Sequence, residues 1–129
     1  MLISFKQLKQ KYDMNISGVI HIGAHFGQEA KDYLDNGIVE MVFFEPLSEN
    51  LKVLEENLSY VAIDANVMIY PVALGNETKD VEMYVSNRDR MCSSILKPKV
   101  VLEQYPDITF DERETVEMMR LDDTDLEFD

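Results

Sequence analysis

The chain has 129 residues, of which 46% are hydrophobic, and its 25 acidic and 12 basic residues leave a formal net charge of −13. This length and apolar content fit one domain with its own core, which we expect over residues 1–129, and exclude a disordered polymer. Nucleic acids and anionic membrane surfaces attract proteins rich in Lys and Arg, so the acidic balance argues against both as partners.

The cysteine content and the length of the apolar runs indicate the cellular compartment in which the protein is expected. Cys92 is the only cysteine, which rules out an internal disulfide and fits a reducing environment. No apolar run approaches the ~20 residues of a membrane span. The N-terminus also lacks the long apolar core of a signal peptide. We therefore expect a soluble, cytoplasmic protein.

Helices and strands alternate through the first 75 residues. Ser4 and Gln7 form a capping-box pattern, β-branched residues mark extended segments, and Gly37 follows a helical pattern where a left-handed residue would end it. Alternation of this kind predicts an α/β fold with a parallel sheet and flanking helices. The expected order is a helix over 4–13, a strand over 16–22, a helix over 28–36, a strand over 39–44, a helix with Ser48 as its N-cap and Leu51, Leu54 and Leu58 on its buried face, and a strand over 67–74.

The second half of the chain is patterned differently. Residues 80–86 alternate apolar and polar side chains, which predicts a half-buried strand. We further expect a short extended piece over 92–96, a brief helix over 100–105 that Pro106 closes, and a strand over 115–121. The acidic tail over 122–129 shows no final element.

The most informative segment runs from Val19 to Glu29, where an apolar strand leads through a Gly-x-x-x-Gly turn into a helix. Small residues at Gly23, Ala24 and Gly27 let a ligand approach the backbone, and the helix that follows offers free N–H groups. A dinucleotide turn has a middle glycine for the pyrophosphate, and this one lacks it. The turn therefore favours a ligand without a pyrophosphate, such as S-adenosylmethionine. The alternative is a tight turn that only packs a helix on a strand.

Glu45 ends the second strand of the alternating half and lies 22 residues after Gly23. A carboxylate at this position can accept hydrogen bonds from both hydroxyls of a ribose. The alternative is a solvated surface glutamate. The apolar run that leads into Glu45 places it at a strand tip, which favours the ribose interpretation.

His21 and His25 are the only histidines, and they are four residues apart across a strand and a turn. A zinc site needs further ligands, so we predict no metal site. We interpret His25 as a residue of the cofactor loop and His21 as a polar strand-end residue near the cofactor. No local Ser-His-Asp or Cys-His pattern is present, and we identify no catalytic base.

Three segments together resemble the FkbM-type methyltransferases of the class I S-adenosylmethionine-dependent enzymes. They are Ile20 to Glu29, Phe43-Phe44-Glu45-Pro46, and Pro71 to Asn76, with a looser match at Ser93-Ser94 and from Thr115 to Asp123. Order and spacing agree with the family over about residues 16–125.

The resemblance implies a Rossmann-like fold, S-adenosyl-L-methionine as cofactor, and O-methyl transfer to a hydroxyl of a sugar or small metabolite. It implies that the loop from Gly23 to Gly27 holds the methionine part and that Glu45 binds the ribose. Pro46 and Leu47 would border the adenine, and Ala73 and Leu74, at the end of the third strand, would lie near it as well.

The chain departs from the family in two ways. Many members have an acidic residue where this chain has His21, and the family's later strands, one of which lies beside the first strand, are not present. The resemblance thus implies a truncated class I methyltransferase fold, incomplete on its C-terminal side, whose first strand has an open edge. An alternative function follows: a non-catalytic methyltransferase-like module that forms a homodimer or docks to a partner chain through that edge.

Overall fold

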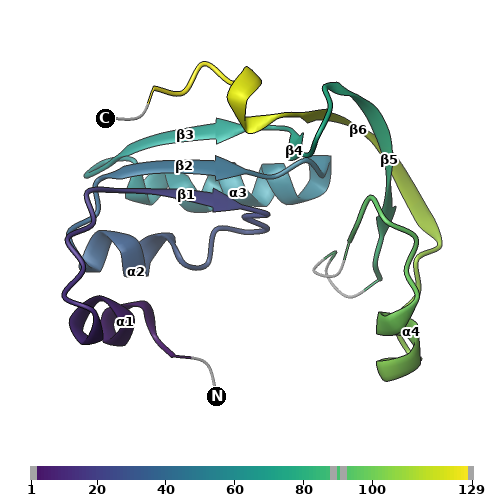
Figure 1. Ribbon diagram of the computed structural model, residues 1–129, viewed down its shortest axis with the longest axis horizontal. Coiled ribbons are helices and arrows are strands. Elements are labelled where there is room, and N and C mark those ends of the chain that lie inside the picture. Colours follow the sequence, from purple (N-terminus) through teal and green to yellow (C-terminus); the bar gives the residue numbers. More distant parts are fainter. Residues whose placement is uncertain (1–2, 88–89, 91–92, 128–129) are drawn as a thin grey trace.

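The structure is a computed structural model in which residues 3–87, 90 and 93–127 are described. It is a mixed α/β structure with two three-stranded sheets (Figure 1). Cys92, the first residue of the extended piece expected over 92–96, lies outside the described residues. Within the rest of that piece, Ser94 forms an isolated antiparallel bridge with Tyr84.

The first sheet contains three parallel strands in the order in which they occur along the chain. They are β1 (Gly18–Ile22), β2 (Glu40–Phe44) and β3 (Asn66–Tyr70), with Ile20 opposite Val42 and Val42 opposite Met68. The helices of this half are α1 (Phe5–Lys11), α2 (Ala30–Asp35) and α3 (Ser48–Val61). The predicted parallel sheet with flanking helices is confirmed.

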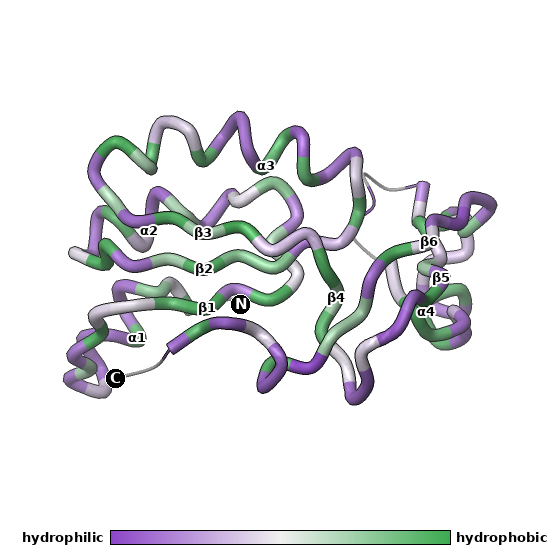
Figure 2. The backbone as a smooth tube through the Cα atoms, turned by 90° about the horizontal axis from the view of Figure 1, so that it is seen from above, coloured by the Kyte–Doolittle hydropathy of each residue, from purple (hydrophilic) through white to green (hydrophobic). Residues whose placement is uncertain are grey.

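The main core lies between this sheet and its helices. Met41 and Phe43 of β2 point toward Leu54 and Leu58 of α3, and all four are buried. Viewed from above, the three apolar strands lie side by side, with α2 beneath them (Figure 2). α1 begins with the predicted capping box at Ser4 and packs on α2. None of the described helices covers the opposite face of the sheet, so this helix-free face keeps part of its apolar side chains exposed.

The strand expected over 67–74 is wrong as a single element, because β3 ends at Tyr70 and the chain then changes sheets. Pro71 lacks a backbone N–H and cannot continue a hydrogen-bonded ladder. Two residues later, β4 (Ala73–Leu74) pairs in parallel with β6 of the second sheet. Ala73 and Leu74 therefore do not end the third strand of the first sheet.

The second sheet has the strand order β4, β6, β5. Its long strands, β5 (Lys79–Val85) and β6 (Glu112–Met119), are antiparallel, and both confirm strands expected from the sequence. The brief helix expected over 100–105 is α4 (Val100–Gln104), and a 3₁₀ turn, η1 (Leu121–Asp123), follows β6. A small core of Leu47, Met83, Val85 and Val116 joins this sheet to the start of α3.

The prediction of Ser48 as an N-cap is wrong. Leu47 occupies the cap position, and Ser48 is the first helical residue. The N–H of Ser48 donates to the Glu114 carboxylate of β6 at 2.9 Å, so the acceptor comes from the second sheet and not from a local side chain. Gly37 does adopt the left-handed conformation expected after α2, with φ of 83°.

Residues 120–127 pass above the helix-free face of the first sheet (Figure 1). Two hydrogen bonds between side chains hold this segment: the Tyr70 hydroxyl donates to Asp125, and the Thr78 hydroxyl donates to Asp123. None of the helices in the described ranges combines the length and apolar composition that a bilayer crossing requires.

Candidate functional site

The glycine turn is held against the end of β2. The N–H groups of Gly23 and Ala24 both donate to the Phe44 carbonyl oxygen, at 2.9 and 3.0 Å. Gly23, His25 and Gly27 have φ values of 72°, 52° and 73°, in the region that favours glycine. The turn thus leaves β1 through three left-handed residues, one of which is a histidine.

Gly27 is required by packing as well as by its backbone conformation. A Cβ atom at this position would lie 2.7 Å from Leu54 Cδ1 of α3. The Asn57 side chain, also on α3, donates from Nδ2 to the Phe26 carbonyl oxygen at 2.8 Å. The packing interpretation of the turn therefore accounts for Gly27. Gly23 differs, because a Cβ atom there would have no described neighbour within 4 Å, and that side of the turn is open.

Glu45 is only 4% exposed, which excludes the interpretation of a solvated surface glutamate. Its Oε2 accepts a hydrogen bond from the His25 N–H at 2.8 Å. Its Oε1 accepts from the Leu47 N–H at 3.0 Å and from Asn50 Nδ2 at 3.4 Å. The carboxylate thus links the glycine turn, the end of β2 and the first turn of α3.

These bonds limit what Glu45 can still bind. A carboxylate offers about four lone-pair positions, and the described donors fill three of them. The remaining position is on Oε2. A ribose that donated both hydroxyls to Glu45 would therefore have to replace one of the internal donors.

Sequence reasoning missed Asn50, which is 1% exposed and contacts Glu45. Its Oδ1 is buried without a hydrogen-bond partner among the described residues. The signal was available, because Asn50 continues the buried face of Leu54 and Leu58 at helical spacing. A polar residue at such a position needs a partner, and Glu45 supplies it for one end of the amide.

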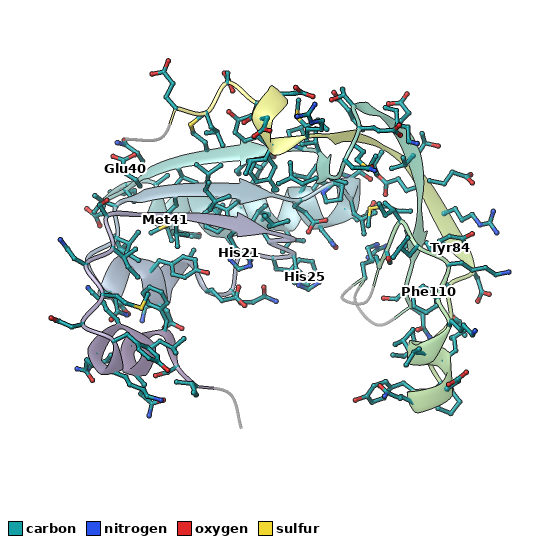
Figure 3. All side chains as sticks on the ribbon, viewed as in Figure 1. His21, His25, Glu40, Met41, Tyr84 and Phe110 are labelled. Atoms are coloured by element: carbon teal, nitrogen blue, oxygen red, sulfur yellow. The ribbon has the colours of Figure 1, made fainter. Side chains whose placement is uncertain are left out.

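The two histidines lie in different surroundings, although both are below the sheet in Figure 3. His21 faces the helix side, where its Nδ1 lies 2.9 Å from the Tyr33 hydroxyl and its ring stacks on Phe43. His25 stacks on Phe26 with 3.7 Å between ring centroids, and its Nδ1 lies 2.9 Å from Gln28 Nε2. His25 is thus part of the turn, and His21 packs between β1 and α2.

The remaining predicted site residues divide into two groups. Pro46 is half-buried directly after Glu45, and Leu47 is fully buried in the core that joins α3 to the second sheet. Ala73 packs against that same core, and Leu74 is half-buried in β4. The structure therefore brings Gly23, Ala24, His25, Glu45 and Leu47 together through hydrogen bonds, whereas Ala73 and Leu74 belong to the second sheet.

Two surface hollows, of about 290 and 280 Å³, lie elsewhere on the chain. Residues between 85 and 112 line the first and residues between 6 and 36 line the second; neither includes the glycine turn or Glu45. In the part of the chain that the structure describes, no group of three or more His, Cys, Asp and Glu side chains is placed to hold a metal ion.

Comparison of the chain with protein-family models, with curated proteins and with solved structures gives no significant match.

Proposed function

We propose that this chain binds S-adenosylmethionine and serves O-methyl transfer to a hydroxyl of a sugar or small metabolite. One observation supports the proposal above the others: the carboxylate of Glu45 accepts the His25 N–H at 2.8 Å. The two motifs that suggested a cofactor therefore meet at the carboxyl ends of β1 and β2. In open parallel sheets, ligands bind at that end of the strands.

The chemistry of the turn agrees with this cofactor. The side of the turn at Gly23 is open to a ligand, and the turn lacks the middle glycine that a pyrophosphate requires. In this proposal the loop from Gly23 to Gly27 holds the methionine part and Glu45 binds the ribose. The fold is then the Rossmann-like sheet of the class I methyltransferases, to which the order β1, β2, β3 corresponds.

Ribose binding has a specific consequence for the turn. Because one position on Glu45 Oε2 is left, the first hydroxyl binds there without loss of an internal bond. The second hydroxyl displaces the His25 N–H, which then turns toward the ligand or water. The methyl group of the cofactor is already electrophilic, so the protein aligns an acceptor oxygen with it and excludes water.

Calorimetry with S-adenosylhomocysteine tests the binding step. We expect heat of binding for the unaltered chain and none for Glu45→Gln, because the amide replaces one acceptor oxygen with a donor. Glu40→Gln is the matched control: Glu40 begins the same strand and lies at the opposite end of the sheet from His25 (Figure 3).

If the unaltered chain releases no heat, or if Glu45→Gln binds as well as Glu40→Gln, the cofactor assignment is wrong. Thermal unfolding of both variants separates lost binding from lost structure. Glu45→Gln is expected to cost about 1–3 kcal/mol of unfolding free energy, since a buried donor is left facing another donor.

A further inference from the structure

β1 lies at an edge of its sheet. It pairs with β2 on one side and with no other described strand on the other. The Gly23 N–H donates to the Phe44 carbonyl, which fixes the phase of the parallel ladder. By alternation, Val19 and His21 turn their backbone groups toward β2, and Gly18, Ile20 and Ile22 turn theirs toward the open edge. Among the described residues, no backbone hydrogen bond reaches these outward groups.

The edge lacks the features that usually prevent strand pairing. β1 contains no Lys, no proline and no charged residue of any kind. On the helix-free face, Ile22 is 60% exposed and Ile20 beside it is half-buried. An edge strand with an exposed isoleucine and no charge is a template for another strand.

The open edge itself carries no charge. The chain carries a net charge of −13, so two copies repel one another over most of their surfaces. Residues 14–28 form the longest stretch without Asp, Glu, Lys or Arg, and β1 lies within it. Within this stretch a basic partner finds no carboxylate, and two copies of the stretch itself meet without like-charge repulsion between them.

We propose that two copies of this chain pair through β1 in antiparallel orientation around a two-fold axis at Ile20. This inference goes beyond the proposed function and does not depend on cofactor binding. The outward backbone groups are self-complementary in this arrangement, as a two-fold interface requires. Ile20 pairs with Ile20 of the second copy and Gly18 with Ile22, which gives about six hydrogen bonds between the chains and a continuous six-stranded sheet. Gly18 has no side chain, so it leaves room for the Ile22 side chain opposite.

Sedimentation velocity over a range of concentrations tests the association. We expect the mass to rise from 14.9 kDa toward twice that value as concentration increases. Ile22→Glu is expected to raise the dimer dissociation constant at least about tenfold, because it adds like charges and removes apolar contact. Met68→Glu is the control: Met68 is 46% exposed on the same face but lies on β3, two strands from β1 at the opposite edge of the sheet, and the change should leave the constant unaltered.

A disulfide test locates the axis. In a Cys92→Ser background, Ile20→Cys should form an interchain disulfide under mild oxidation, since directly opposed strand residues lie within disulfide range. Met68→Cys in the same background should stay unlinked. A monomer at every concentration overturns the proposal. So does a dimer that Ile22→Glu leaves unchanged, or one in which Ile20→Cys does not crosslink. If Ile22→Glu fails to fold, the Ile20→Cys crosslink alone tests the proposed dimer.

Discussion

Gly27 and Gly37 have the same left-handed backbone but different surroundings. Their φ values are 73° and 83°, so a side chain at either position is strained. Only at Gly27 would a Cβ atom also meet a neighbour, at 2.7 Å from Leu54 Cδ1, whereas one at Gly37 would meet no described atom within 4 Å. The first glycine therefore has two reasons to be a glycine, and the second has one.

This difference predicts unequal effects of alanine. Gly37→Ala should lower the free energy of unfolding by about 1–2 kcal/mol, the cost of a left-handed non-glycine residue. Gly27→Ala should lower it by about 1–3 kcal/mol more, because the added methyl group overpacks the turn against α3. Urea unfolding measures both values. If both variants lose the same free energy of unfolding, the turn accommodates the added methyl group at Gly27 and the predicted overpacking is wrong.

Tyr33 makes stability depend on pH in the alkaline range. Burial, aided by the nearby charges of Glu29 and Asp32, raises the pKa of its hydroxyl above 10.0. The folded chain then holds this proton more tightly than the unfolded chain does. The resulting stabilisation is complete below about pH 10 and is lost as pH rises through the folded-state pKa.

Tyr33→Phe should therefore reduce the loss of stability between about pH 9 and 11, as measured by urea unfolding at several pH values. Part of the slope should remain, because the hydrogen bond to Asp125 raises the pKa of Tyr70 as well. Tyr60→Phe is the comparison, since it makes the same chemical change at a largely exposed tyrosine. An unaltered slope in Tyr33→Phe would contradict the assignment.

Among the elements, α3 depends on a distant strand for its first turn. Neither Leu47 at the cap position nor Ser48 supplies a side-chain cap, and the N–H of Ser48 donates instead to Glu114 of β6. The carboxylate also lies at the positive end of the helix dipole, which adds to the attraction. The Glu114 side chain thus couples the second sheet to α3. The first residues of this helix in turn hold Glu45 in place.

Glu114→Ala should cost about 0.5–2 kcal/mol of unfolding free energy, in the range of lost helix caps. Chemical denaturation followed by circular dichroism measures the change. Glu117→Ala on the same strand is the comparison, because Glu117 is exposed and makes no described bond to α3. If the two variants lose the same stability, the bond to Ser48 contributes nothing.

The boundaries that sequence reasoning set wrongly share one cause. Ser48 fits the local preference for an N-cap, and residues 67–74 fit a single apolar strand. Both expectations used neighbours in the sequence. Glu114, which caps α3, lies 66 residues after Ser48. Ala73 and Leu74 join another sheet because they pair with Met118 and Met119 of β6. Pro71 did mark the end of β3 in the sequence, but neither the bond from Ser48 to Glu114 nor the pairing of Ala73 and Leu74 with β6 leaves a local pattern in the chain.

At the scale of the whole molecule, the parallel half followed from periodicity. The apolar faces of β1, β2 and α3 and the turn at Gly23 were readable from the spacing of side chains. The juxtaposition of the glycine turn with Glu45 was also predictable, because both end neighbouring parallel strands. The burial of Glu45 was not predictable, since the groups that enclose and bind it come from two segments, the glycine turn and the start of α3.

The strand order of the second sheet has a consequence for how the chain is made. β6 lies in the middle, between β4 and β5, yet it is the last of the three to be synthesised. While the N-terminal sheet can assemble early on the ribosome, β4 and β5 wait for the strand that joins them. The nascent chain therefore exposes Met83 and Val85, both buried in the finished protein, until residues 112–119 emerge.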